Sequence, residues 1–490
     1  MDFSREQFLA VEERYGLNGL RCGGFPYWTL LRTEIYRKLK RYAGGAAGKQ
    51  TGNNAVSPIH NKLGAIRSML NVISSGYFHP QRLKKHVDVL FRVHSRRILE
   101  GRYYRSIYTD ELLKYYPNSM CIENSYLKPG FHHKPVEEAI YFLDRLGFVA
   151  GWWAKIQIKF RTKRFQNVDA GIASSLKEPL EQLYGMVGLP FRFEAERAWM
   201  TRFTLECMKL EALYAVLIKK IDPRIVVEVV SYSKETAILN LCAKKLGIPT
   251  VELQHGQINI DHMAYQYPPD VAVEKLPNHF LSFGDYWNEL IHFPRDAVEI
   301  VSVGFPFFEK ERRKYSGASS QSDGKTEILF LPNLVDFQLA EAAAKLADLL
   351  DENEYQIVYK LHPSEAQKWR TLYPQLDRPG IHMIETTDIP LYQLLSEADV
   401  QVGTKSTAVF EGFGFGLQTF ILKCRDNSSM QALEAKGIVQ LFSDAEELRA
   451  LLQNRDDRQH FTDTQYFWKE DALNNMRMQI DRLLTERSGR

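Results

Sequence analysis

Short apolar runs alternate with helix-spaced segments along much of this chain. The clearest case begins with the β-branched run 224–230, followed by a polar turn and a helix-spaced segment that reaches Leu246. Gly247 ends that segment, as glycine does after many helices, and a second apolar run follows at 248–254. Uninterrupted apolar runs are typical of parallel strands buried on both faces. A helix between two of them predicts a right-handed β-α-β unit.

The same alternation recurs on both sides of this unit. Residues 134–222 carry a mostly helical pattern, and a second series of strands and helices begins near Glu327. Alternating strands and helices predict doubly wound parallel sheets. The expected fold class is therefore α/β, with two Rossmann-like domains. Further strands are expected at 86–93, 120–123, 281–283, 301–303, 327–333, 355–361, 380–384, 398–402 and 418–422.

The length of 490 residues supports more than one domain. We expect a helical, basic N-terminal extension over 1–80 and a first Rossmann-like domain over 81–314. A Ser- and Gly-rich linker at 315–324 precedes a second Rossmann-like domain over 325–464. The last segment, 465–490, is expected to be a helix that crosses back onto the first domain.

Composition narrows the function classes. A net charge of +3 gives no global reason to expect a nucleic-acid partner. The five cysteines are scattered and odd in number, which favours buried thiols over a disulfide framework or a metal site. The first residues lack the pattern of a signal peptide, and no run of 18 apolar residues occurs. We expect a cytoplasmic protein.

The turn after the apolar run 399–402 is the first candidate for chemistry. Gly403 ends the run, Ser406 and Thr407 suit a helix N-terminus, and Lys405 adds a positive charge. The first amides of a helix lack internal partners and can bind a phosphate. Glu411, one turn into the helix, is placed to reach a ribose. The alternative interpretation is a strand–helix turn with ordinary capping.

A second candidate lies about 40 residues upstream. The strand expected over 355–361 delivers Lys360 and His362 at its carboxyl end, and Pro363 is suited to the first position of a following helix. Ligands of open α/β sheets bind beyond the carboxyl ends of the strands. The two stretches therefore predict one nucleotide site, although a lone histidine at a strand end is more often structural.

These motifs resemble those of a known group of enzymes. Lys360-Leu361-His362-Pro363 and Ser406-Thr407 are similar to the His-Pro and Ser-Ser/Thr motifs of bacterial sialyltransferases, Kdo transferases and CDP-glycerol glycerophosphotransferases. Gln254-His255-Gly256 resembles the His-Gly element of the glycerophosphotransferases. The resemblance covers about residues 224–445, while the first 220 residues match no such motif. The paired acidic residues before glycine that sialyltransferases use for their base are not evident here.

The resemblance implies a GT-B glycosyltransferase of bacterial surface polysaccharide synthesis, such as capsule or lipopolysaccharide. The donor would be a nucleotide sugar, often CMP- or CDP-linked in these families. The acceptor would be a saccharide or a lipid-linked saccharide, and no resident cofactor is implied. The second domain would bind the donor and the first would bind the acceptor.

Transfer requires a base near the acceptor hydroxyl and charge neutralisation at the leaving phosphate. His255 follows a strand and precedes a glycine, and imidazole titrates in the range useful for a general base. Glu235 and Asp261 are the carboxylate alternatives, and a turn histidine bonded to backbone is the structural alternative for His255. No DxD element stands at a strand end, so we expect no metal.

Other interpretations remain open from sequence. The basic stretches 25–41 and 155–164 suit either a peripheral association with the inner membrane or solvated helix faces. His132 and His133 are expected at the surface. A sugar-nucleotide epimerase of the same fold and a non-catalytic polysaccharide assembly protein are the alternative functions. The basic, aromatic N-terminal third argues against the epimerase, because that mass suits a polymeric or lipid-linked acceptor.

Overall fold

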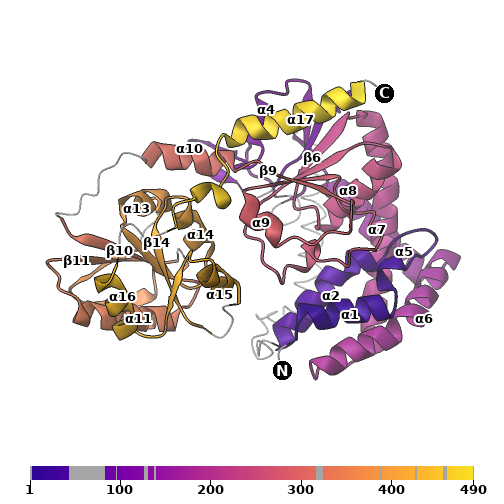
Figure 1. Ribbon diagram of the computed structural model, residues 1–490. Coiled ribbons are helices and arrows are strands. Elements are labelled where there is room, and N and C mark those ends of the chain that lie inside the picture. The colour runs from indigo at the N-terminus through magenta and orange to yellow at the C-terminus, as the bar shows by residue number, and fades with distance from the viewer. Residues whose placement is uncertain are drawn as a thin grey trace. The chain divides into compact units, whose positions relative to one another are not determined.

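The computed structural model describes residues 3–43, 83–94, 97–125, 131–136, 140–315, 324–362, 364–385, 389–424, 428–455 and 461–488. The chain forms two compact units (Figure 1). The first comprises Met1–Ser282, Glu289–Val301 and Leu473–Arg490. The second comprises Phe283–Asn288 and Ser302–Ala472.

The first unit is built on a seven-stranded sheet. Its strands lie in the order β5-β4-β1-β6-β7-β8-β9, and the pairings from β5 to β8 are parallel. The chain builds the sheet outward from β1 in one direction and then, from β6, in the other. The strands are β1 (Val89–Arg92), β4 (Ser119–Glu123), β5 (Ile140–Phe142), β6 (Ile225–Val229), β7 (Thr250–Leu253), β8 (His279–Ser282) and β9 (Glu299–Ser302).

Helices of the first unit share one large apolar core with this sheet. Helices α1, α2, α5, α6 and α7 gather on one side of the unit (Figure 1). A short antiparallel hairpin, β2 (Ile98–Glu100) and β3 (Tyr103–Arg105), stands apart from the sheet. The helices are α1 (Arg5–Arg14), η1 (Leu17–Gly19), α2 (Trp28–Ala43), α4 (Asp110–Leu113), α5 (Asp144–Lys159), α6 (Lys163–Met186), α7 (Phe193–Ile221), α8 (Lys234–Lys245), η3 (Met263–Tyr265) and α17 (Ala472–Ser488).

The second unit is built on a six-stranded parallel sheet. Its order is β12-β11-β10-β13-β14-β15, so β10 and β13 are the neighbours at which the winding direction reverses. The strands are β10 (Thr326–Leu331), β11 (Tyr355–Lys360), β12 (Ile381–Ile384), β13 (Val400–Gly403), β14 (Gln418–Leu422) and β15 (Gln440–Phe442). The helices are α9 (Asp285–Glu289), α10 (Pro306–Tyr315), α11 (Phe337–Leu349), α12 (Trp369–Leu372), η4 (Pro374–Leu376), α13 (Leu391–Glu397), α14 (Thr407–Phe413), α15 (Ser428–Ala435), α16 (Ala445–Gln453) and η5 (Thr464–Tyr466).

Both sheets have the doubly wound order of the Rossmann fold, which confirms the predicted fold class.

Local sequence signals explain where several helices begin and end. Gly247 has a φ of +65° after α8, a conformation that favours glycine. The helix α14 spans Thr407–Phe413, as the apolar spacing predicted, with Ser406 at its N-cap.

An aromatic cluster fixes α14 within the second unit. The indole nitrogen of Trp468 donates to the carbonyl of Phe410 at 2.8 Å, and that of Trp287 donates to Phe467 at 2.8 Å. The ring of Trp468 also stacks on Phe308, with centroids 4.3 Å apart. The helix that begins at the predicted phosphate-binding turn is therefore held by packing along its apolar face.

Some sequence predictions were wrong in detail. The helix predicted from residue 465 begins at Ala472, although α17 does belong to the first unit. A helix was also expected to begin at residue 363. Instead, the described residues 364–368 form turns, and α12 begins at Trp369. Strands β5 and β15 were not predicted. Pro363 itself, residues 44–80 of the predicted N-terminal extension and residues 316–323 of the predicted linker lie outside the described residues.

Candidate functional site

The carboxyl ends of β10 and β13 meet at the point where the second sheet reverses its winding. In doubly wound sheets this reversal opens the crevice in which ligands bind. The side-chain amide of Asn333 donates to the hydroxyl of Thr404 at 2.6 Å, and that hydroxyl donates to Asp336 at 3.1 Å. Asp336 also caps α11 through the amide of Leu339 at 3.2 Å. The two loops at the reversal are thus fixed to each other.

The turn after β13 carries four of the predicted donor-site residues. A Cβ at Gly403 would lie 2.6 Å from Val409, so only glycine fits at the end of this strand. The hydroxyl of Ser406 donates back to the carbonyl of Leu331 at 3.4 Å and makes no side-chain cap on α14. Lys405 is half-buried, and Thr407 is exposed at the first position of the helix.

The end of β11 carries Lys360 and His362. Burial lowers the pKa of the half-buried Lys360. The exposed ring of His362 accepts a hydrogen bond at Nδ1 from the backbone N–H of Ser364 at 3.3 Å, and the Ser364 hydroxyl lies 2.7 Å from the same nitrogen. A backbone N–H can only donate, so Nδ1 is the acceptor and the ring proton of neutral His362 resides on Nε2. Nε2–H is then the hydrogen-bond donor of this ring.

The β11 and β13 ends flank β10 on either side. At the usual strand spacing their polar residues are about 10 Å apart. The sheet therefore brings His362 and the Gly403–Thr407 turn to one edge, with Asn333 between them. Glu411 is differently engaged: its carboxylate accepts from the hydroxyl of Tyr392 on α13 at 3.0 Å.

The loop after β10 contains a strained residue that the sequence did not reveal. Val335 has a φ of +57°, which is costly for a β-branched side chain. Its backbone N–H donates to the buried carboxylate of Glu365 at 2.9 Å, and Tyr373 donates to the same oxygen at 2.8 Å. Strained backbone held in this way is typical of ligand-binding loops.

In the first unit, His255 follows β7, next to the reversal between β1 and β6. The hydroxyl of Tyr232 lies 3.1 Å from Nε2 of His255. Tyr108 donates to the carbonyl of His255 at 2.6 Å, and the ring of His94 stacks at a centroid distance of 6.3 Å. Burial raises the pKa of Tyr232 to about 12, so its hydroxyl keeps its proton at neutral pH. Tyr232 thus contacts the ring of the histidine predicted as base, and Tyr108 fixes its backbone.

This edge also has a strained valine and a buried carboxylate. Val230 has a φ of +67° at the end of β6, and the next amide, of Ser231, donates to Glu252 at 3.0 Å. Tyr265 donates to the same oxygen at 2.9 Å. Burial raises the pKa of Glu252 to about 7. Glu228, its register partner on β6, is also buried, and burial and the neighbouring Glu252 raise its pKa well above the usual range.

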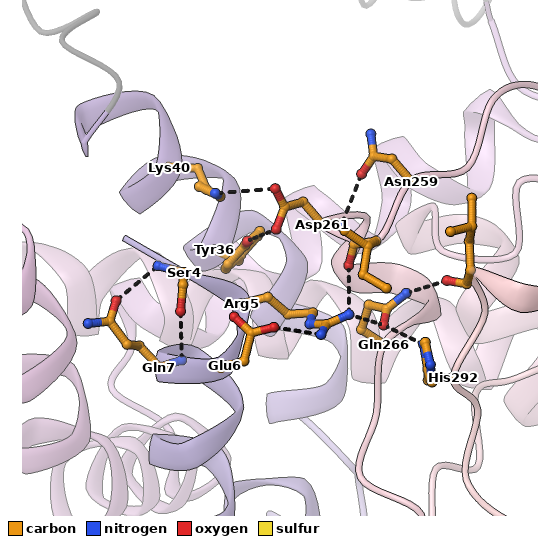
Figure 2. Close-up of polar contacts among 12 residues, drawn as sticks. Ser4, Arg5, Glu6, Gln7, Tyr36, Lys40, Asn259, Asp261, Gln266 and His292 are labelled. Carbon is orange, nitrogen blue, oxygen red and sulfur yellow. Dashed lines mark hydrogen bonds and ion pairs between the residues drawn. The ribbon is translucent and has the colours of Figure 1, made fainter. Parts of the chain in front are cut away.

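The two carboxylate alternatives to His255 have other partners. Glu235, in the first turn of α8, lies 3.4 Å from the ammonium of Lys234, which also lies 3.8 Å from Glu206 of α7. Figure 2 shows Asp261 held by α2, with Tyr36 and Lys40 each 3.4 Å from its carboxylate. Glu235 is thus paired with a neighbouring lysine, and Asp261 links its loop to α2.

Figure 2 also shows how α1 secures the loop that follows His255. Arg5 donates to the carbonyl of Ile260 at 3.3 Å and to the side chain of Gln266 at 3.1 Å. Nδ1 of His292 lies 2.9 Å from the same side-chain oxygen of Gln266. The N-terminal helices therefore act as a brace for the loop after β7.

The prediction that His132 lies at the surface was wrong. Its ring contacts Asp144 at 2.7 Å and Glu123 at 3.3 Å, and its side chain is only 7% exposed. Arg97 also binds Glu123, at the end of β4. Burial alone lowers the pKa of His132, but the hydrogen bonds to the two carboxylates outweigh it, and the pKa is raised. No sequence pattern indicates this network, because its partners come from separate elements.

Within the described residues, no group of three or more His, Cys, Asp or Glu side chains is arranged to hold a metal ion. None of the helices in the described part of the chain is both long and apolar enough to cross a membrane.

Comparison with known proteins gave structural similarity alone. No protein-family model matches the chain, and no curated protein matches its sequence. A putative UDP-N-acetylglucosamine 2-epimerase from Listeria monocytogenes is similar in structure, at 12% identity and a TM-score of 0.48 over 82% of this chain and 97% of its own. MurG from Acinetobacter baumannii is 11% identical, with a TM-score of 0.44 over 82% of this chain and 99% of its own. The calicheamicin glycosyltransferase CalG4 is 12% identical, with a TM-score of 0.39 over 82% of this chain and 95% of its own. Similarity at this level does not distinguish a transferase from an epimerase.

Proposed function

We propose that this chain is a GT-B glycosyltransferase. It transfers a sugar, or a sugar-like or polyol phosphate unit, from a nucleotide-activated donor to a saccharide or lipid-linked saccharide of a bacterial surface polysaccharide. A CMP- or CDP-linked donor is the first to test, because the His-Pro and Ser-Thr elements resemble those of enzymes that use such donors. Donor binding is assigned to the second unit and proton abstraction to the first.

One observation carries the donor assignment. Lys360 and His362 on one side, and Lys405, Ser406 and Thr407 on the other, come from the two strands that flank β10 at the reversal of the second sheet. Donors and cations converging on the crevice of a doubly wound sheet are suited to a phosphate group.

The proposed roles follow from the chemistry of the leaving group. In transfer of a sugar, the acceptor oxygen bonds to the reactive carbon of the donor while the bond from that carbon to the nucleotide phosphate oxygen breaks. In transfer of a polyol phosphate, the acceptor oxygen bonds to the phosphorus of that unit while the bond from this phosphorus to the nucleotide phosphate oxygen breaks. The phosphate departs with the bonding electrons and gains negative charge, which Nε2–H of His362 and the ammonium of Lys360 would stabilise. No metal ion is assigned a role in this step.

The acceptor proton is assigned to His255. Tyr232 contacts its imidazole at Nε2, and the bond from Tyr108 fixes its backbone. Positioned imidazoles act as general bases near neutral pH. The carboxylates of Glu235 and Asp261 remain alternatives, but both already have basic partners, Lys234 and Lys40.

Release of free nucleotide from a panel of sugar nucleotides tests the proposal. CMP-, CDP- and UDP-linked donors are incubated with the protein, with and without oligosaccharide and lipid-linked acceptors. A transferase releases nucleotide faster when its acceptor is present. An epimerase converts the sugar with no acceptor, and a non-catalytic assembly protein does neither, so either result would overturn the proposed function.

A further inference from the structure

The helix α5 exposes an unusual number of large apolar side chains. Trp152 is 61% exposed and Phe160, directly after the helix, is 68% exposed. Phe148 and Val149 are each 41% exposed. Isolated exposed apolar residues are common, but a group on one element marks an interaction site.

Helical geometry places these residues on a common face. At about 100° per residue, Phe148, Val149 and Trp152 point to one side of α5, and Ala150 and Ala154 point to the other. The two alanines are buried in the core. Leu146, Trp153 and Ile158 of the same helix also pack against the core, so α5 carries large apolar side chains on both its inner and its outer face. The outer face of an ordinary surface helix is charged or polar, so the exposed aromatic side chains of α5 are the unusual feature.

Basic residues surround the exposed apolar group. From residue 145 to residue 168 the chain has six basic residues and no acidic one: Arg145, Lys155, Lys159, Arg161, Lys163 and Arg164. All six are exposed, and the ammonium of Lys159 lies 5.6 Å from the ring centre of Phe160. A helix with Trp and Phe on a face rich in Lys and Arg is suited to the interface of an anionic membrane.

The other basic, aromatic segment has no such face. In α2 the side chains of Trp28, Tyr36 and Leu39 are buried in the core. Two of its basic residues have acidic partners, since Lys38 binds Glu196 and Lys40 lies near Asp261. The structure thus separates two stretches that looked equivalent in sequence: α5 can insert apolar side chains into lipid, whereas those of α2 stabilise the fold.

The exposed face of α5 begins near the candidate base of the first unit. The helix follows β5, so its first turn lies at the carboxyl edge of the sheet, the edge at which His255 follows β7. Asp144, in that first turn, is fixed by His132. The exposed face thus begins at the edge that carries the candidate base.

We propose that the face formed by Phe148, Val149, Trp152, Lys155, Lys159 and Phe160 docks the protein on an anionic lipid surface. The aromatic side chains enter the headgroup region and the lysines bind lipid phosphates. This inference goes beyond the proposed function, because it concerns lipid binding and holds whatever reaction the chain catalyses.

Vesicle sedimentation of the full chain tests the inference. The vesicles are phosphatidylcholine alone, or phosphatidylcholine with phosphatidylglycerol, at low salt. We expect binding to the anionic vesicles, with at least tenfold weaker partitioning for Trp152→Ser/Phe160→Ser and for Lys155→Glu/Lys159→Glu. Matched controls are Val216→Ser, an exposed apolar residue of α7, and Lys219→Glu/Lys220→Glu, which makes the same change in charge. Both controls should stay within twofold of wild type.

Three results would overturn the inference. The first is no binding of wild type to anionic vesicles, and the second is an equal loss in the control variants. The third is a loss with the lysine variant but none with Trp152→Ser/Phe160→Ser, which would show that the aromatic side chains do not enter the headgroup region. A spectroscopic readout is independent of affinity: brominated lipid should quench tryptophan fluorescence less in Trp152→Phe, although that variant still binds.

Discussion

The hydroxyl of Tyr232 lies 3.1 Å from Nε2 of His255, at the reversal of the first sheet. With its pKa raised to about 12, Tyr232 keeps its proton, and where its oxygen accepts from Nε2–H of His255, Nδ1 is the nitrogen assigned to take the acceptor's proton. Tyr232 is thus a positioning residue, and His255 is the group assigned to the reaction.

Replacing His255 should reduce turnover much more than replacing Tyr232. His255→Gln removes the base, and turnover with saturating donor and acceptor should fall about 10²- to 10⁴-fold. Tyr232→Phe removes one hydrogen bond of about 1 kcal/mol, so turnover should fall only about fivefold. Steady-state kinetics over a range of pH measures both. Near-normal turnover of His255→Gln would transfer the role of base to Glu235 or Asp261.

Stability should depend on pH through Glu252. Burial raises the pKa of this carboxyl to about 7 from 4.5, so between these values the folded chain holds a proton that the unfolded chain has released. The free energy of unfolding therefore falls by at most about 3 kcal/mol as pH rises through this window. Above the window this contribution no longer changes. Glu252→Gln should reduce that decline. Urea unfolding from pH 4.5 to 8 measures it, with the exposed Glu341→Gln as control. Parallel curves for wild type and Glu252→Gln would contradict the assignment.

The helix α14 depends on a glycine. A Cβ at Gly412 would overlap the side-chain amide of Gln401, which is fully buried and donates to Val409 at 3.0 Å and Thr419 at 2.7 Å. Gly412→Ala should lower the free energy of unfolding by about 1–3 kcal/mol, the usual range for overpacking. Gly185→Ala, in α6, meets open space and should be neutral or stabilising. Equal stability of the two variants would show that the buried amide can move aside.

Metal independence can be tested in solution. The sequence has no DxD element at a strand end, and the proposed charge neutralisation uses protein groups alone. Turnover should therefore persist in excess chelator. Full loss of turnover in EDTA that Mg²⁺ or Mn²⁺ restores would assign part of the phosphate binding to a metal ion.

Much of the fold could be predicted because its signals are local. The apolar run before Gly403, the cap at Ser406 and the apolar spacing beyond it together defined β13 and α14 closely. The run of β-branched residues before Ser231 did the same for β6. Strand β15 has only three residues, too few for a clear pattern.

The site was only partly predictable, because its contacts join residues far apart in the chain. Thr404 meets Asn333 across 71 positions, and Tyr108 meets the backbone of His255 across 147. The apolar pattern of β6 and β7 also concealed Glu228 and Glu252, since a carboxyl inside an apolar strand looks like an exposed exception until the sheet buries it. Strand order, which the sequence does not state, decides which of these residues meet.

Nucleotide binding at the second unit is the most direct test of the proposed function. Isothermal titration with CMP, CDP, UMP and UDP compares wild type with His362→Ala and with His382→Ala, which removes an exposed histidine from the neighbouring strand β12. At least one nucleotide should bind wild type. His362→Ala should weaken it by roughly 10- to 150-fold, the loss of a hydrogen bond to a charged group worth about 1.5–3 kcal/mol. His382→Ala should stay within twofold of wild type. Wild-type affinity in His362→Ala, or equal weakening in both variants, would contradict the donor site at the reversal of the second sheet.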